Sequence, residues 1–242
     1  MDRVLIFLYL SSVFGEEKRL LLHTDADLVS VINEMKQEIA DLKSEVNTLK
    51  ATNLPSGNSD VYIRWGRTSC PSNGTEFVYS GYMAGGYYSD DGGGANNLCL
   101  PDHPTWNKYV DGYNNGATIY GTEIELDPSV SSALFGQNVI NQDIPCAVCR
   151  TRASAHMFPA RTNCYSGWTM EYSGYLISSH PTWKDQSDYI CLDVNLEFVA
   201  HGAANDNAHV IRPVEVKCGN SGGLPCPPYV DGRELACVVC SK

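Results

Sequence analysis

The chain has 242 residues, of which 43% are hydrophobic, enough for one substantial domain or two small ones with packed cores. This content argues against a disordered chain. The formal net charge of −11 and the sequence pI near 4.9 argue against nucleic acids, heparin-like chains and anionic membrane surfaces as partners, since all of these repel an acidic protein.

Residues 1–15 have the pattern of a secretory signal peptide. Arg3 precedes an apolar run from Val4 to Leu10, and Val13 and Gly15 stand at positions suited to cleavage. The run is far shorter than the roughly 20 apolar residues that a membrane span requires. No second apolar stretch of spanning length and no lipidation motif follows, so we expect a secreted, extracellular protein without a membrane anchor.

Residues 25–52 carry a heptad pattern that predicts a parallel coiled coil. Glu38 and Glu45 fall at g positions, where they face Lys43 and Lys50 at the e positions of a neighbouring helix. A single amphipathic helix docked on its own domain is the alternative, but it has no need of opposite charges beside a narrow apolar stripe. The expected oligomerisation residues are Leu28, Met35, Leu42 and Leu49 at d, and Ile32, Ile39 and Val46 at a.

Residues 53–60 form a linker rich in Pro, Gly, Ser and Asn, and short apolar runs separated by Gly and Asn follow it. These runs predict a mainly β fold, which we divide into a first subdomain at 61–152 and a second at 153–242. The expected strands are Phe77–Tyr79, Ile119–Tyr120, Ile124–Leu126, Val194–Val199 and Val214–Val216.

The β region contains an internal duplication. TSCPSNGTEFVYSGYM from Thr68 matches TNCYSGWTMEYSGYL from Thr162, each copy continues to a Cys-Leu pair, and each closes on Cys-x-Val-Cys. Ten cysteines in a secreted chain predict disulfide bonds, in preference to a zinc site or a thioredoxin-like redox pair. Cys218 and Cys226 occur in the second half only and most simply pair with each other.

These motifs resemble the C-terminal non-collagenous domain of type IV collagen, and more closely the same domain of spongin-type short-chain collagens of invertebrates. The resemblance covers residues 61–242, although the chain has no Gly-X-Y repeat. It implies two similar β-rich subdomains and assembly into trimers, whereas the coiled-coil residues alone also allow a dimer. It further implies the disulfide pairs Cys70–Cys149, Cys99–Cys146, Cys164–Cys240, Cys191–Cys237 and Cys218–Cys226.

Tyrosines among small polar residues are the candidate ligand-binding side chains, because this composition makes adaptable recognition surfaces. The alternative, which we favour, is that they fill the β core and cover its rim. Asn73-Gly74-Thr75 is an N-glycosylation acceptor sequence and predicts a glycan on Asn73. The candidate ligand loops contain Tyr82, Tyr87, Tyr88, Tyr109 and Tyr113.

Catalytic and metal sites are weakly indicated. The loop Gly219–Gly223 resembles the nucleophile loop of chymotrypsin-like proteases, but only 65 residues separate Ser221 from His156, too few for a second barrel. His103 and His180 each begin His-Pro-Thr-Trp, which predicts turns with a packed Trp106 or Trp183 rather than metal ligands. Neither Asp90-Asp91 with Asn96-Asn97 nor Asn205-Asp206-Asn207 has the spacing of a known calcium loop.

We therefore expect a non-enzymatic protein that needs no cofactor or metal. The first interpretation is an extracellular matrix structural or assembly protein, a homo-oligomer that contacts matrix proteins or glycans. The second is a secreted multivalent recognition protein, such as a lectin or innate-immune binder, in which oligomerisation multiplies a weak affinity.

Overall fold

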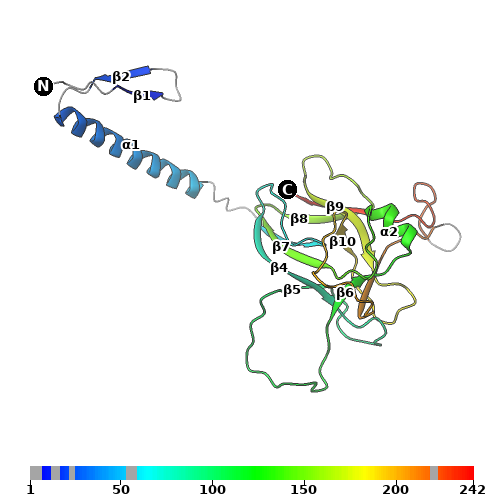
Figure 1. Ribbon diagram of the computed structural model, residues 1–242. Coiled ribbons are helices and arrows are strands. Elements are labelled where there is room, and N and C mark those ends of the chain that lie inside the picture. Colours follow the sequence, from blue (N-terminus) through cyan, green and yellow to red (C-terminus); the bar gives the residue numbers. More distant parts are fainter. Residues whose placement is uncertain (1–6, 12–16, 22–24, 53–58, 219–222) are drawn as a thin grey trace. The chain divides into compact units, whose positions relative to one another are not determined.

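The computed structural model describes residues 7–11, 17–21, 25–52, 59–218 and 223–242. The chain divides into two compact units, Met1–Ser56 and Gly57–Lys242 (Figure 1). The predicted subdomains 61–152 and 153–242 both fall within the second unit. Within the described ranges, no helix combines the length and apolarity needed to cross a membrane.

The first unit contains a hairpin and a helix. Strand β1 (Phe7–Ser11), inside the predicted signal peptide, pairs antiparallel with β2 (Glu17–Leu21). The proposed cleavage positions Val13 and Gly15 lie outside the described residues. Helix α1 (Asp25–Thr52) spans the predicted heptad segment, and the side chains of Leu28 and Leu49 are outside the described part. The other five seam residues are 41–58% exposed on this single chain: Ile32, Met35, Ile39, Leu42 and Val46.

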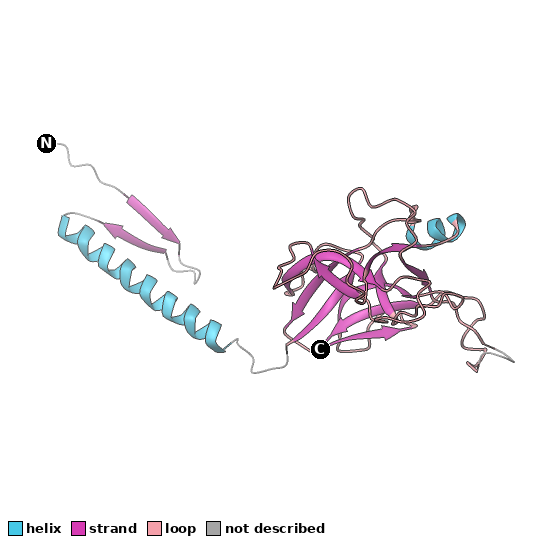
Figure 2. Ribbon diagram, turned by 90° about the horizontal axis from the view of Figure 1, so that it is seen from below, coloured by secondary structure: helices cyan, strands magenta, loops and turns pink. Residues whose placement is uncertain are grey.

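The second unit is mainly β and contains one ten-stranded mixed sheet (Figure 2). The path β10-β3-β7-β4-β6-β11-β9 closes on itself, because β10 pairs with both β3 and β9; β12 and β8 continue from β9, and β5 pairs with β4. The strands are β3 (Asp60–Trp65), β4 (Glu76–Gly85), β5 (Leu98–Pro101), β6 (Tyr120–Ile124), β7 (Pro145–Thr151), β8 (Ala155–Pro159), β9 (Thr169–Ser178), β10 (Ile190–Asp193), β11 (His209–Pro213) and β12 (Ala236–Ser241).

The two sequence halves are joined through this sheet. Strand β6 of the first half runs parallel to β11 of the second, and β3 pairs with β10 at Trp65 and Leu192. The larger hydrophobic core contains Met83 and Ile144 from one half together with Ile177 from the other. Because apolar side chains of both halves share one core, neither half buries its own apolar face alone.

Five disulfides stabilise the second unit and leave no free cysteine among the described residues. They are the same five pairs that the resemblance implies. Four close loops of 46–79 residues and one closes a loop of 8, so in the chain-entropy account the long-range four restrict the unfolded state most. The pairs are Cys70–Cys149, Cys99–Cys146, Cys164–Cys240, Cys191–Cys237 and Cys218–Cys226.

The aligned motifs of the two halves make matching contacts. The Tyr79 hydroxyl donates to the Cys99 carbonyl at 2.8 Å, and the Tyr172 hydroxyl donates to the Cys191 carbonyl at 2.9 Å. In the first copy a Cβ on Gly81 would lie 1.7 Å from a carbonyl oxygen of the neighbouring strand, as would one on Gly174 in the second copy. The YSGY motif therefore brings two strands so close that only glycine fits between them.

The Cys-x-Val-Cys motifs lie in β7 and β12, whose residues are almost all buried. Of the other expected strands, Phe77–Tyr79 lies in β4, and Tyr120 and Ile124 are the ends of β6, but Ile119, Glu125 and Leu126 fall outside it. Helix α2 (Pro128–Phe135) was not expected from the sequence; it lies at the periphery of the strands (Figure 2).

One expected strand is wrong. Residues Val194–Val199 form a bend at 194–195 and then irregular backbone, because the Asp193 carboxylate accepts the Asn195 backbone N–H at 2.8 Å and bends the chain. The expectation for Val214–Val216 is confirmed only in part: β11 ends at Pro213, but Glu215 forms an isolated antiparallel bridge with Glu234, and the Val216 backbone N–H donates to the Arg233 carbonyl at 2.9 Å. The predicted linker 53–60 ends one residue late, since Asp60 already begins β3.

Candidate interaction surface and buried polar sites

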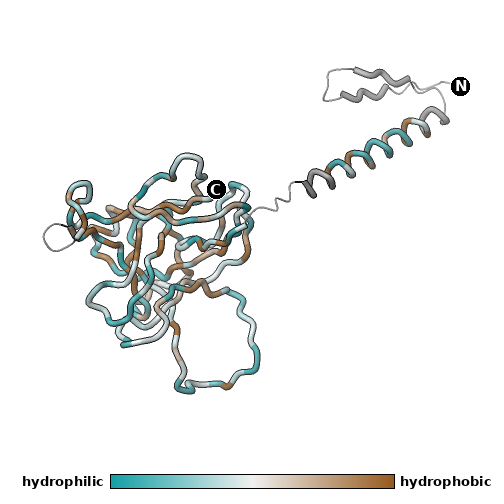
Figure 3. Tube along the Cα trace, turned by 180° about the vertical axis from the view of Figure 1, so that it is seen from behind, coloured by the Kyte–Doolittle hydropathy of each residue, from teal (hydrophilic) through white to brown (hydrophobic). Residues whose placement is uncertain are grey.

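The most exposed apolar residues of the second unit lie on the segment between β5 and β6, residues 102–119, named here the long loop. All its residues are exposed, and it stands away from the strands (Figures 1 and 3). Trp106, Tyr109, Val110 and Tyr113 are 70–99% exposed, so the expected packing of Trp106 is wrong. Loops longer than about 15 residues without secondary structure are usually either functional or linker segments, and contiguous exposed apolar side chains favour an interaction site.

The long loop is held mainly at its first residue. The Asp102 backbone N–H donates to the Ser80 carbonyl at 3.2 Å, and the Ser80 hydroxyl lies 3.3 Å from the Asp102 carboxylate. Farther along, the hydrogen bonds are local, such as that from Asn114 to the Gly112 carbonyl at 2.8 Å. The sheet thus fixes the start of the loop but gives its aromatic side chains nothing to pack against.

Two other candidate tyrosines, Tyr87 and Tyr88, lie in an aromatic cluster instead. Their ring centroids are 5.0 Å apart, and Tyr88 also meets Trp183 edge-on at 6.1 Å. The guanidinium of Arg212 lies 5.7 Å from the centre of the Trp183 ring. The cluster is half-buried, so Trp183 packs as expected, whereas Tyr82 is exposed on β4. The candidate residues therefore occupy separate environments.

Residues of both candidate calcium segments make ion pairs or hydrogen bonds with other residues of the protein. Asp91 pairs with Lys184 at 2.9 Å, and the Asn97 backbone N–H donates to Asp188 at 2.9 Å. Asn207 donates to Asn205 within the other candidate. Across the part of the chain that the structure describes, no three His, Cys, Asp or Glu side chains are grouped so that they could hold a metal ion.

Of the two protease-like candidates, His156 lies within the described residues. Ser221 lies outside the described residues, as do 219, 220 and 222. His156 lies in β8 opposite Cys240, and its ring packs edge-on against Phe158 at 4.8 Å. Each of the His-Pro-Thr-Trp histidines makes a local hydrogen bond, His103 to Asp102 at 2.7 Å and His180 to Thr182 at 2.8 Å.

A buried carboxylate that the sequence did not indicate connects both ends of the domain. Glu171 of β9 is 7% exposed and accepts hydrogen bonds from Tyr62 at 2.8 Å, Asn73 at 3.0 Å, Thr75 at 2.9 Å and Ser241 at 2.6 Å. Burial acts to raise the pKa of Glu171, but these hydrogen bonds outweigh it and hold the pKa below its usual value. We name these five side chains the Glu171 cluster.

A second buried carboxylate lacks such side-chain donors. Glu123 of β6 is 2% exposed, and neither carboxylate oxygen makes a hydrogen bond of good geometry within the described residues. It stands opposite Asp143 across an antiparallel bridge, with further negative charge from Glu125 and Asp206. Burial raises the pKa of Glu123, and the negative charges add to this, although the nearby Asn207 backbone N–H acts in the opposite direction. Burial with Asp206 raises the pKa of Asp143. Two carboxylates that face each other across paired strands destabilise the fold when both are ionised.

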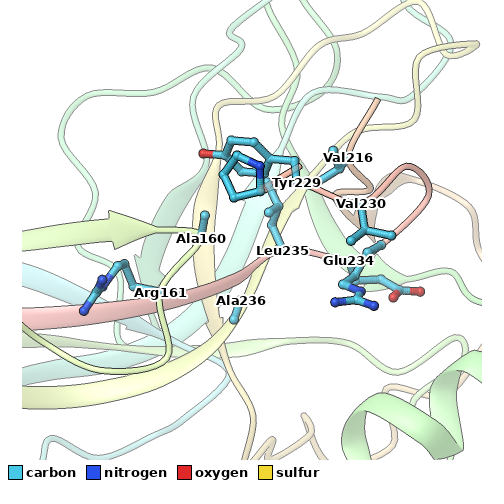
Figure 4. Close-up of a pocket in the computed structure, with 10 residues that line it drawn as sticks. Ala160, Arg161, Val216, Tyr229, Val230, Glu234, Leu235 and Ala236 are labelled. Atoms are coloured by element: carbon cyan, nitrogen blue, oxygen red, sulfur yellow. The ribbon is translucent and has the colours of Figure 1, made fainter. Parts of the chain in front are cut away.

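One surface cavity of about 480 Å³ lies beside the C-terminal part of the chain, lined by residues 160–161, Val216, 228–230 and 233–236. Figure 4 shows Tyr229 and Leu235 at its centre, Arg161 on one side, and Val230 and Glu234 on the other. Its volume is within the range of small-molecule sites, but its lining mixes both charge signs with apolar groups and specifies no one ligand class.

No protein-family model matches the chain.

Proposed function

We propose that this chain is a secreted, non-enzymatic protein of the extracellular matrix that contacts a protein partner through the long loop. The observation that carries this proposal is the set of aromatic side chains on that loop, Trp106, Tyr109 and Tyr113, which are 70–99% exposed. Such aromatic residues are enriched at protein interfaces because they bury a large area at a small entropic cost.

Secretion is supported by the pattern of residues 1–15 and by the disulfides. Bridges with loops of 46–79 residues persist in oxidising compartments and are rare in the cytosol. The predicted signal peptide would deliver the chain to such a compartment.

Homo-oligomerisation is supported by the open stripe on α1. Ile32, Ile39 and Leu42 are 41–58% exposed at heptad spacing on the single chain, and a second copy would bury them. A helix with this stripe gains most from partners of the same kind, since the flanking Glu and Lys residues pair only in register. We favour a trimer, which the family resemblance implies, with a dimer as the alternative.

Relationship to the collagen IV C-terminal domain is supported by the matching contacts of the two halves. A duplicated unit explains why Tyr79 and Tyr172 bond equivalent carbonyls and why Gly81 and Gly174 lie equally close to a neighbouring strand. We propose that the two halves arose from one repeated unit of this family, with the coiled coil in place of a collagen helix.

The proposal is tested with a loop variant carrying Trp106→Ser, Tyr109→Ser and Tyr113→Ser. Pull-down from matrix extract should recover specific proteins with the purified wild type and lose them with this variant, at an unchanged unfolding temperature. Tyr189→Ser is the matched control, because Tyr189 is 63% exposed but lies outside the loop. Equal capture by all three proteins would refute the role of the loop.

A recognition protein is the second candidate, favoured by the half-buried pair Tyr88 and Trp183, since a fixed aromatic platform suits stacking on a sugar ring. Reproducible signal on a glycan array, lost in Trp183→Ala and retained in the loop variant, would support this candidate instead. Light-scattering mass of the mature protein tests oligomerisation for both, and a monomer would remove the multivalency argument.

A further inference from the structure

The side-chain nitrogen of Asn73, the predicted glycan acceptor, makes two hydrogen bonds within the folded protein. Asn73 Nδ2 donates to the Met170 carbonyl at 3.3 Å and to Glu171 Oε2 at 3.0 Å. Both partners are pure acceptors, so the amide nitrogen rather than the amide oxygen must face β9. The two hydrogens of this nitrogen are therefore both directed at β9.

The rest of the acceptor sequence is held as well. Thr75 Oγ1 lies 2.9 Å from Asn73 Oδ1 and 2.9 Å from Glu171 Oε2. Gly74 between them has a φ of +92°, a conformation that favours glycine. The nearby Cys70–Cys149 bridge attaches this turn to β7. The acceptor is thus a formed turn packed against a strand, although its outer surface faces solvent.

N-glycosylation changes the donor count at this nitrogen. Transfer forms a bond from Nδ2 to the anomeric carbon of the saccharide, breaks the bond from that carbon to the lipid pyrophosphate, and releases the lipid pyrophosphate with the electron pair. One hydrogen of Nδ2 leaves as a proton, so one N–H remains. Whichever hydrogen is replaced, the sugar would point at the Met170 carbonyl or the Glu171 carboxylate.

We propose that a glycan on Asn73 and the closed Glu171 cluster exclude each other. A chain that folds first keeps Asn73 unmodified, and a chain that is modified first folds with the Asn73 side chain turned out of the cluster. Either folding or glycosylation can come first, because β9 follows Asn73 by about 97 residues and is synthesised later. The inference concerns the fold and holds whichever proposed function applies.

The experiment uses the mature chain, refolded and oxidised without any glycan, incubated with solubilised oligosaccharyltransferase and a lipid-linked oligosaccharide. The matched control is Ala117→Thr, which makes Asn115, an exposed residue of the long loop, an acceptor. In this oxidised variant we expect transfer to Asn115 and none to Asn73, read by peptide mass spectrometry. After reduction and alkylation both sites should be modified.

A second variant, Thr75→Val, removes the acceptor sequence and should abolish transfer to Asn73 in the reduced chain. Modification of Asn73 as rapidly as Asn115 in the oxidised protein, with its near-UV circular dichroism unchanged, would overturn the proposal. So would a glycosylated wild type whose unfolding temperature equals that of the unmodified protein, because a closed cluster would then tolerate the glycan.

Discussion

Replacing Glu123 by Gln should stabilise the folded protein at neutral pH, the opposite of the usual effect of a core substitution. The wild-type carboxylate is buried, makes no hydrogen bond of good geometry and faces Asp143. An unsatisfied buried polar group costs about 1–3 kcal/mol, more if charged, and a like charge opposite adds about 0.2–1 kcal/mol. The Gln amide removes the charge and can donate to Asp143. We expect a gain of about 1–3 kcal/mol, raising Tm by about 2–4 °C per kcal/mol.

The gain should depend on pH in a defined direction. Since the folded protein raises the pKa of Glu123, the wild type is relatively more stable when this carboxyl is protonated and loses stability as pH rises through the raised pKa. The difference between Glu123→Gln and wild type should therefore be largest near pH 8 and shrink toward about pH 4.5. Burial lowers the pKa of His209 to about 4, so this residue also makes stability depend on pH. Its contribution is the same in wild type and variant and cancels in the difference.

The assay is chemical denaturation with disulfides intact, from about pH 5 to about pH 8, the range in which most proteins are stable. Glu76→Gln is the control, because Glu76 is an exposed carboxylate 3.3 Å from the Arg150 guanidinium and is not among the charges that act on Glu123, so its loss should not stabilise the protein. If Glu123→Gln destabilised the protein equally at every pH, the carboxylate would have a stabilising partner and the reasoning would fail.

Other substitutions test the strand contacts and bridges. Gly174→Ala should prevent recovery of folded, oxidised protein, because its Cβ would lie 1.7 Å from a carbonyl oxygen, whereas Gly121→Ala, with nothing within 4 Å, should fold normally. Tyr79→Phe and Tyr172→Phe should each lower the free energy of unfolding by about 1–3 kcal/mol in urea titrations, and no loss for either would contradict the bonding role of its hydroxyl. Full reduction should abolish the near-UV circular dichroism signal, since each long-range bridge contributes about 2–4 kcal/mol; an unchanged spectrum would refute this.

Local sequence patterns predicted the mainly β fold, because short apolar runs separated by Gly and Asn depend only on neighbouring residues. The Cys-x-Val-Cys motifs are apolar runs with a valine between cysteines, and both lie in buried strands. The heptad segment 25–52 coincides with α1. Helix α2 was missed although Asp127-Pro128 and Gly136 flank it, a proline at the first turn and a left-handed glycine after the last. Its length of eight residues gave too little periodicity to detect.

Long-range strand order was not predictable in this way. Val210 pairs with Glu123 in the parallel alignment of β11 with β6, and the sequence of neither segment indicates that the other is its partner. The expected strand at Val194–Val199 failed for a related reason. Its apolar residues suggested a buried strand, but Leu196 instead packs beside Gly66 from the other half, and the Asp193 carboxylate turns the chain.

The two buried carboxylates show why candidate sites are harder to predict than strands. Glu171 and Glu123 both lie in strands among apolar residues, and local pattern gives them the same environment. Glu171 is satisfied by donors 70–109 residues away, whereas Glu123 meets a second carboxylate 20 residues away. The charge state of each group, and hence its effect on stability, therefore depends on tertiary partners that the alternation of side chains along a strand does not specify. The membership of Asn73 in the Glu171 cluster depends on a tertiary partner in the same way. Its sequence motif predicts an exposed glycan acceptor, but in the fold its side chain donates a hydrogen bond to Glu171 of β9.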